Sequence, residues 1–149
     1  MITNKLFLTG ILLGVSLSAN ASGDLIKKAS RNGVPQTMDR LEQIVRDKGL
    51  SVFNRIDHQA NAINVEMEMG AAQVLIFGSP KLGTAIMKQD PAAGLDLPLR
   101  VLVYQDGEGK TWISYHDPGA LESEYQLKGN PAILKAQGAL GAITDAAAE

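Results

Sequence analysis

The 149-residue sequence contains no cysteine. This absence excludes structural disulfide bonds, thiolate metal sites, thiol catalysis and a lipid-modified cysteine near the N-terminus. A fold built from this chain must therefore be held together by its hydrophobic core alone.

The sequence also lacks a hydrophobic run long enough to span a membrane. Its longest apolar stretch, Leu6 to Leu17, is shorter than the roughly 18 to 20 residues that a membrane helix needs. A lysine precedes this stretch and the small residues Ala19 and Ala21 follow it, which is typical of a secretory signal peptide. We predict a signal peptide at residues 1–21, cleavage after Ala21, and a periplasmic or secreted domain at residues 22–149. A retained membrane anchor is the alternative.

Neither sign of charge dominates the sequence. It has 14 Lys+Arg and 16 Asp+Glu, a net charge of −2, with no basic stripe or acidic block. This distribution is not typical of proteins that bind nucleic acid or adsorb to anionic lipid. We therefore expect no nucleic-acid partner and no stable membrane insertion after processing, and the length fits one domain with a real core.

Three segments carry the signals of helices. Residues 37–48 have apolar residues at helical spacing, with Thr37 placed to cap the start and Gly49 to end the helix. Ser79 followed by proline predicts a helix through about Lys88, and Asn130 followed by proline predicts a last helix near the C-terminus. A shorter helix with Asp57 as its N-cap is expected at residues 59–65.

The remaining apolar segments predict strands. Residues 99–105 and 110–116 flank a Gly-Glu-Gly turn and indicate an antiparallel hairpin. Strands are also expected at residues 24–29, 51–57 and 73–77. The last of these is apolar on both faces, which indicates an interior place in the sheet, whereas the first is expected at an edge. This order predicts an α+β fold: a two-layer sandwich with a mostly antiparallel sheet and helices packed on one face.

A set of short motifs connects the chain to a known family. The motifs are KGLSVF at 48–53, RIDH at 55–58, FGSPKLG at 77–83 and LDLPLR at 95–100, followed by a tyrosine-ended hairpin. Together they resemble the domain-of-unknown-function family 302 over roughly Asp24 to Pro118. The resemblance implies a compact α/β fold, a homodimer and often an exported form, but no activity. The chain has His116 where the family's pattern leads us to expect a small polar residue, so the resemblance implies no role for His116.

The turn at Gly78-Ser79-Pro80-Lys81 is the first candidate site. A helix start presents free N–H groups and partial positive charge, and Lys81 adds a full charge. One interpretation is a cradle for a carboxylate or phosphate. The alternative is a helix capped by Ser79 with Lys81 in solvent. The turn lacks the glycine-rich loop of a nucleotide-binding P-loop.

The histidines form the second group of candidates. His58, beside Asp57 at a strand end, could be a general base or a metal ligand, or it could be bonded to backbone while Asp57 caps a helix. The family resemblance favours a place for His58 in a cleft. His116 and Asp117 could in principle complete a metal site with them, but no ligand spacing supports one. We predict no metal and no cofactor.

Arg100 is the third candidate. It shares a sheet face with Leu102 and Tyr104, whereas Tyr115 in the paired strand shares a face with Ile113. An arginine beside tyrosines can hold a carboxylate or an aromatic ligand. The alternative is an ion pair between Arg100 and Asp96 or Glu68.

No catalytic motif is assembled in this sequence, because neither Ser79 nor Ser114 sits in a nucleophile elbow. We predict a binding module whose cleft, where the helix start at residues 78–81 meets the hairpin, holds a small anionic or amphipathic ligand. The expected lining residues are His58, Ser79, Lys81, Arg100 and Tyr115. The alternatives are an acid/base enzyme that uses His58, and a dimeric interaction protein without a small-molecule site.

Overall fold

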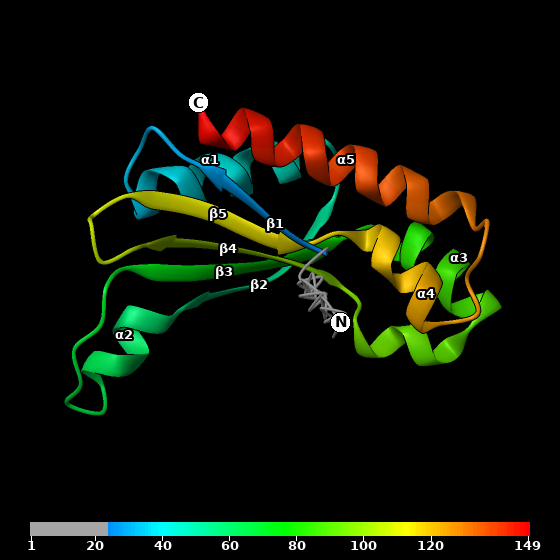
Figure 1. The fold of residues 1–149 in the computed structure, drawn as a ribbon, viewed down its shortest axis with the longest axis horizontal. Coiled ribbons are helices and arrows are strands. Elements are labelled where there is room, and N and C mark those ends of the chain that lie inside the picture. The colour runs from blue at the N-terminus through cyan, green and yellow to red at the C-terminus, as the bar shows by residue number, and fades with distance from the viewer. Residues whose placement is uncertain (1–23) are drawn as a thin grey trace, which may run out of the picture.

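A computed structural model describes residues 24–149, so the predicted signal peptide and its cleavage site lie outside the described residues. Within this range the chain forms a sheet with helices stacked against it (Figure 1). The strands are β1 (Leu25–Ala29), β2 (Ser51–Asp57), β3 (Ala72–Gly78), β4 (Leu99–Gln105) and β5 (Thr111–His116). The helices are α1 (Val34–Asp47), α2 (His58–Ile63), α3 (Pro80–Gln89), α4 (Leu121–Glu124) and α5 (Pro131–Ala148), with short 3-10 helices η1 (Pro91–Leu95) and η2 (Pro118–Ala120).

The five strands form one sheet in the order β1-β5-β4-β3-β2, and each neighbouring pair is antiparallel. The predicted hairpin is the β4–β5 pair. β3 lies between β2 and β4, and β1 lies at an edge, as their apolar patterns indicated. The predicted α+β sandwich with an antiparallel sheet is therefore confirmed.

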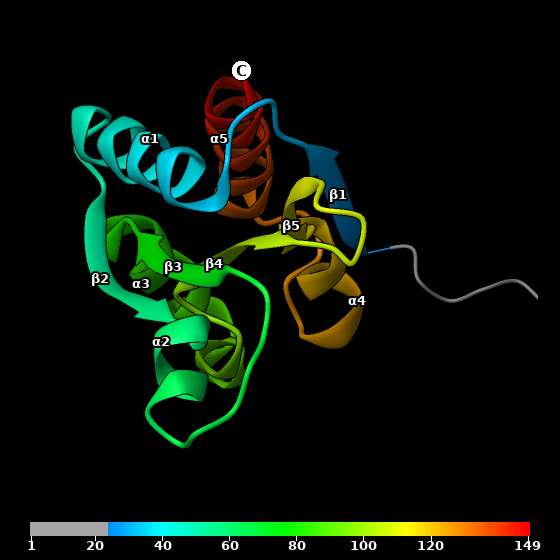
Figure 2. The same cartoon turned by 90° about the vertical axis from the view of Figure 1, so that its left-hand side faces the viewer.

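The core lies between one face of the sheet and the helices α1 and α5, which cover that face side by side (Figures 1 and 2). Strand alternation sends every second side chain to this face, and helical spacing gives α1 and α5 each an apolar stripe. Burial of one such large side chain contributes about 1.5–3 kcal/mol. The main members of this core are Met38, Leu41, Val45, Leu75, Phe77, Val101, Val103, Ile113, Tyr115, Leu140 and Ile143.

The other face of the sheet carries no helix layer in the described residues, and we call it the open face. α2 and α4 lie toward its margins, on the side opposite α1 and α5 (Figure 2). The apolar side chains that alternation directs to the open face are half-buried rather than buried. They are Ile56, Val74, Ile76, Leu102, Tyr104 and Trp112.

The start of α1 differs from the sequence prediction. The helix begins at Val34, three residues before the predicted start at Thr37. Pro35 lies in the first turn, where a residue without N–H costs no hydrogen bond. Thr37 is fully buried inside the helix, and its hydroxyl lies 2.7 Å from the Ser30 hydroxyl, so its polar group serves tertiary packing instead of capping.

The other predicted helix starts are confirmed. The Ser79 hydroxyl accepts a hydrogen bond from the Leu82 N–H at the start of α3, and Asn130 caps α5 in the same way. Asp57 caps α2, which ends at Ile63 and is shorter than expected. The elements η1 and η2 were not predicted, although each begins with an Asp-Pro pair that signals a cap, at Asp90 and Asp117.

No helix within residues 24–149 has the length and apolar character needed to cross a membrane.

Candidate functional site

An apolar pocket lies where α3 meets α5 and the ends of β2, β3 and β4. Its volume is about 290 Å³. The Ser79 cap and Pro80 start α3 directly after β3, so the first two turns of that helix form one wall. α5 forms the opposite wall because its apolar stripe continues from the core into the pocket.

The pocket is lined by uncharged side chains, among which only Ser79 and Thr84 are polar. Its deepest members belong to the hydrophobic cores, and its rim is partly exposed: Phe53 has 52% and Met87 has 36% of its surface accessible. The lining residues are Leu50, Phe53, Phe77, Gly78, Ser79, Pro80, Leu82, Gly83, Thr84, Ile86, Met87, Leu97, Pro98, Leu99, Ala136, Ala139, Leu140 and Ile143.

This lining determines what the pocket can hold. The Ser79 hydroxyl is occupied by the cap to Leu82, at 3.3 Å. An ionised group in the pocket would lose its hydration without gaining a charged partner, at a cost of several kcal/mol. An apolar group instead gains about 25 cal/mol for each Å² removed from water. The pocket therefore suits the apolar part of a ligand.

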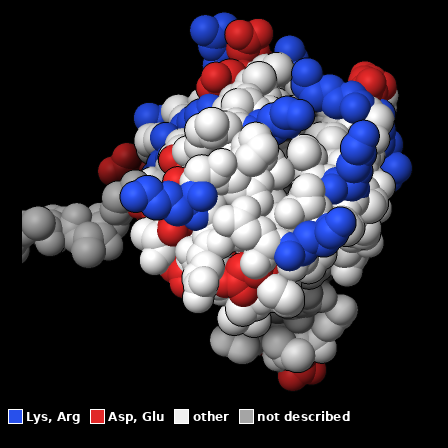
Figure 3. All heavy atoms as spheres, turned by 90° about the vertical axis from the view of Figure 1, so that its right-hand side faces the viewer, with Lys and Arg blue, Asp and Glu red and all other residues white. Residues whose placement is uncertain are grey.

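Among the predicted ligand-binding residues, only Ser79 lines this pocket. Lys81 is exposed on the first turn of α3, between the lining residues Pro80 and Leu82. At the end of the molecule that holds α3, Figure 3 shows mostly uncharged atoms, with Lys and Arg as well as Asp and Glu side chains around them. The Lys81 ammonium group therefore lies outside the apolar lining, where it is available to the polar head group of a ligand.

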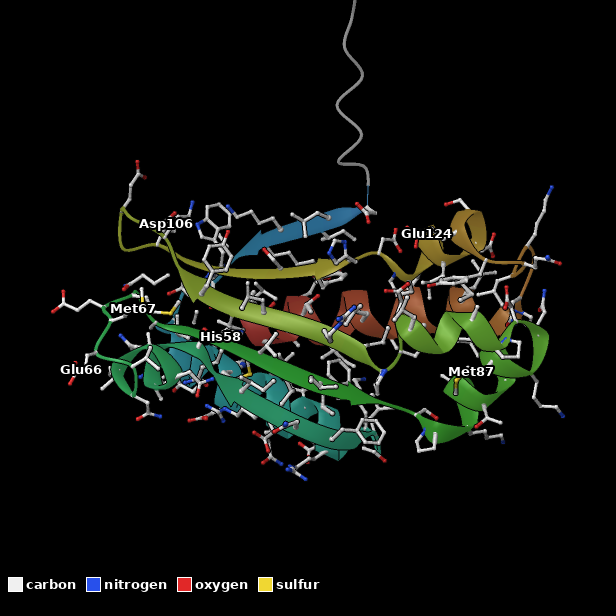
Figure 4. The ribbon with its side chains drawn as sticks, turned by 90° about the horizontal axis from the view of Figure 1, so that it is seen from below. His58, Glu66, Met67, Met87, Asp106 and Glu124 are labelled. Carbon is white, nitrogen blue, oxygen red and sulfur yellow. The ribbon has the colours of Figure 1, made fainter. Side chains whose placement is uncertain are left out.

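His58 lies away from the pocket. It is exposed at the start of α2, and Figure 4 shows His58 and Met87 toward opposite ends of the sheet. Its neighbour Asp57 is engaged twice: one carboxylate oxygen caps Ala60 at 2.9 Å and the other accepts from Gln73 at 3.1 Å. The capping interpretation of Asp57 is therefore confirmed. Within residues 24–149, Asp57 makes no hydrogen bond to the His58 side chain.

Arg100 and Tyr115 project from opposite faces of the sheet, as the strand alternation predicted. Tyr115 is 5% exposed and belongs to the core beneath α5. Arg100 is exposed on the open face, and its Nη2 lies 3.6 Å from Asp96. The ion-pair interpretation of Arg100 is therefore confirmed, and the five predicted residues do not meet in one cleft.

A second, smaller hollow of about 200 Å³ lies beside Arg100 and is polar. Several of its charged groups already pair with one another or with neighbours. His116 Nδ1 lies 3.0 Å from Asp24, and the Tyr125 hydroxyl donates to Asp96 at 2.5 Å. Asp96 raises the pKa of Tyr125 to about 12, because deprotonation would lose this hydrogen bond and place two negative charges together. These groups offer a ligand few free partners.

Metal ligands are not grouped in the described part of the chain: residues 24–149 contain no cluster of three or more His, Asp or Glu side chains that could hold an ion. His58 and His116 lie at opposite ends of the sheet. His58 follows the last residue of β2 and His116 is the last residue of β5, and these two strands run in opposite directions.

Sequence reasoning missed most of the pocket. Its walls come from α5, from β2 and from the loop before β4, and these segments are far apart in the chain. Leu82 and Leu140 lie on the apolar sides of α3 and α5, but the helical spacing of apolar residues does not reveal which of them border a void. Phe53 lies in the edge strand β2 with 52% of its surface accessible, and this exposure becomes known only from the structure.

A family model described as "Domain of unknown function DUF302" matches residues 26–149. A solved structure described as the crystal structure of uncharacterized conserved protein DUF302 from Bacillus stearothermophilus superposes with a TM-score of 0.73. It covers 85% of this chain and 99% of that chain at 18% identity, so it supports the fold alone.

Curated relatives with a named activity also match. They include the fluoride-specific ion channel FluC 1 of Brucella suis biovar 1 (strain 1330), 36% identical over 103 residues, and FluC 2 of Brucella melitensis biotype 1 (strain ATCC 23456 / CCUG 17765 / NCTC 10094 / 16M), also 36% identical over 103 residues. The match covers 69% of this chain but 41% and 38% of those proteins. The chain thus spans about two fifths of the length of these relatives.

Proposed function

This chain belongs to the DUF302 family of domains of unknown function, and from that premise we propose that it is a binding module for a small amphipathic molecule. The apolar part of the ligand occupies the pocket between α3 and α5. One observation carries the proposal: an uncharged hollow of about 290 Å³ is lined by members of both hydrophobic clusters of the domain. Ligand pockets of proteins have volumes from about 300 Å³ upward and are mostly apolar.

The polar end of the ligand lies at the rim beside Lys81. Lys81 is exposed at the start of α3, where the helix dipole also favours negative charge. A carboxylate on the ligand therefore gains a modest attraction without entering the apolar lining. The proposed ligand is therefore both amphipathic and anionic, with an apolar part in the pocket and a carboxylate beside Lys81.

Titration of the described domain with decanoate and with decanol, by displacement of 1-anilinonaphthalene-8-sulfonate, tests the pocket. Ala139→Phe places a ring in the pocket, whereas Ala142→Phe changes an exposed position of α5 outside the lining. We expect saturable binding that Ala139→Phe weakens at least about tenfold, which corresponds to about 1.4 kcal/mol. Ala142→Phe should leave it unchanged.

Lys81→Ala tests the rim. It should weaken decanoate about two- to fivefold, as expected for an exposed ion pair, and leave decanol unaffected. The proposal of a ligand in the pocket would be wrong if the protein showed no saturable binding, or if the Ala139→Phe and Ala142→Phe variants bound equally well.

The curated relatives support a second candidate function. We propose that this domain acts together with a fluoride channel, because sequence shared with this chain makes up about two fifths of such channels. The described part of this chain has no helix that could form the pore. A strain that lacks this chain should accumulate more fluoride than its parent. An unchanged fluoride content, with no channel recovered alongside the tagged protein, would count against this function.

Export remains part of the proposal. The signal peptide at residues 1–21 rests on the apolar stretch and the small residues before Ser22. N-terminal sequencing of the protein from the exporting cell should begin at Ser22, and recovery of an intact Met1 would contradict processing.

A further inference from the structure

The mouth of the apolar pocket differs in chemistry from its buried end. Phe53, Met87 and Pro98 are exposed lining residues at the mouth, whereas the buried end is mostly aliphatic. We propose that the ligand of this pocket is an aromatic carboxylate with an alkyl substituent, and that its ring lies against Phe53 at the mouth. This inference rests on the proposed function, because it names the chemical class of ligand for the same pocket.

Phe53 is turned toward the pocket by an irregularity in β2. Val52 pairs with Phe77 of β3, on the side of the sheet that the helices cover. Asn54 pairs with Ile76, on the open face, so that Phe53 between them has no partner in β3 and forms a β-bulge. Bulges of this kind re-aim a side chain and are common next to functional sites. The bulge therefore places an aromatic ring at the pocket while half of its surface stays accessible.

The space beside the Phe53 ring is free of side chains because residue 78 is glycine. A Cβ atom added at Gly78 would lie 3.9 Å from the Phe53 ring and 3.8 Å from Pro98. A ligand ring in this space contacts the Phe53 ring, and offset or edge-to-face contacts between aromatic rings stabilise more than the buried area alone predicts. An aliphatic chain covers the same surface without this additional stabilisation.

Met87 provides a second contact that favours an aromatic ring. Its side chain lies close to two glycines, because a Cβ atom added at Gly83 would lie 3.9 Å from its methyl group and one added at Gly94 would lie 3.1 Å from its sulfur. Met87 is 36% exposed and lies at the end of the sheet opposite His58 (Figure 4). Contacts between a thioether sulfur and an aromatic ring are favourable, and the flexible methionine side chain adjusts to the ring it meets.

The buried end and the rim determine the orientation of the ligand. Ile86, Leu140 and Ile143 are aliphatic and each 1% exposed, so the buried end accepts an alkyl group. The carboxylate lies outside, beside the exposed Lys81, because the apolar lining offers an ionised group no partner. A benzoate with an alkyl group in the para position has its three parts in this order: carboxylate at the rim, ring at the mouth and alkyl group inside.

Isothermal titration calorimetry of the protein with two matched compounds tests the ligand class. The compounds are 4-pentylbenzoate and trans-4-pentylcyclohexanecarboxylate, which share the carboxylate, the pentyl chain and the number of carbon atoms but differ in the aromaticity of the ring. We expect the benzoate to bind about three- to tenfold more tightly, as an aromatic contact beyond area burial predicts.

Phe53→Leu removes the aromatic partner at an exposed position that folding does not need. In this variant the preference for the benzoate should fall below about twofold, the low end of what an aromatic pair contributes. Tyr104→Leu removes an aromatic ring from the open face, outside the lining, and should keep the wild-type preference. A preference that persists in Phe53→Leu would overturn the inference.

The position of the ring is tested by NMR of the methionine methyl groups. The ring current of 4-pentylbenzoate should shift the signal of the Met87 methyl group, whereas the cyclohexane compound should shift it much less. Met67, which is 64% exposed and lies outside the lining, is the control and should not respond to either compound. An unshifted Met87 signal in the benzoate complex would place the ring elsewhere and overturn the inference.

Decanoate, titrated in the same series, separates this inference from the proposed function. If decanoate binds and the two ring compounds bind equally well, the pocket holds an amphipathic ligand but the aromatic class is wrong. If none of the three compounds binds, the proposed function is wrong and the inference fails with it.

Discussion

Arg55 donates two hydrogen bonds to the side-chain oxygen of Gln73, from Nε at 2.9 Å and from Nη2 at 2.7 Å. Its Nη1 reaches α1, where it lies 2.6 Å from Asp39 and 3.2 Å from Glu42. Gln73 in turn donates to Asp57, which caps α2. A continuous chain of polar contacts thus links α1, β2, β3 and the start of α2.

Arg55→Ala should destabilise the domain. The change removes two donors from Gln73, which is only 9% exposed, and leaves a polar group with fewer partners. We expect a loss of about 1–3 kcal/mol in the free energy of unfolding, measured by urea denaturation. Arg40→Ala, on the exposed side of α1, is the control and should change stability by less than about 0.5 kcal/mol. Equal effects of the two substitutions would contradict a structural role for the chain.

Glu42→Gln should change how stability depends on pH. The hydrogen bond from Arg46 lowers the pKa of Glu42 below 4.5; partial burial opposes this, and Arg55 adds to the lowering. Because the pKa is lower in the folded state, the stabilisation is present above pH 4.5 and is lost as pH falls through the folded pKa. The variant should therefore be less stable than wild type near neutral pH and approach it in acid. A stability difference that is the same at both pH values would refute this linkage.

Asp96→Asn should lower the pKa of Tyr125. The Asp96 carboxylate accepts a hydrogen bond from the Tyr125 hydroxyl and raises the pKa of Tyr125 to about 12, whereas an amide lacks the charge. The pKa should move toward 10.0, the ordinary value of tyrosine. NMR titration of the Tyr125 ring carbons measures it directly. Glu122→Gln is the control and should leave the titration unchanged; an unchanged titration in Asp96→Asn would contradict the assigned hydrogen bond.

Lys28→Met should loosen the end of α5. The Lys28 ammonium group donates to the carbonyl oxygen of Gly141 at 3.0 Å and to the Thr144 hydroxyl at 2.8 Å, and it pairs with Asp145 at 2.5 Å. Methionine keeps the apolar stem but none of these bonds, so we expect a loss of about 1–3 kcal/mol because charged donors are involved.

Hydrogen exchange in the last turns of α5 provides a local measure of the same change, and it should accelerate in Lys28→Met. Lys128→Met alters an exposed lysine before α5 and serves as the control. If exchange in α5 stays at the wild-type rate, Lys28 does not hold this helix against β1.

Several elements could be predicted because their signals are local. Ser79 and Asn130 stand directly before prolines and cap α3 and α5, and strand alternation placed Arg100 and Tyr115 on opposite faces. The start of α1 was misjudged because two signals competed. Thr37 has the chemistry of a cap, but Pro35 allows an earlier start and burial gives the Thr37 hydroxyl another partner.

The grouping of the predicted site residues could not be predicted from local sequence patterns. His58, Ser79, Lys81, Arg100 and Tyr115 each carried a plausible chemical role. Their grouping into one cleft depended on the order of the strands and on the lengths of the connections, which periodicity does not encode. The structure places Tyr115 in the core and Arg100 on the open face, so that only Ser79 lines the pocket.

The sequence by itself determined the α+β class, the hairpin, the caps of α2, α3 and α5 and the family, because these depend on neighbouring residues and on a period of two or 3.6. The tertiary structure alone decided the pocket and the open face of the sheet. A void forms where side chains from α3, α5 and the loop before β4 fail to meet, and a sheet face stays open when both long helices pack on its other side. Such features arise from packing between distant segments, and no short stretch of sequence contains them.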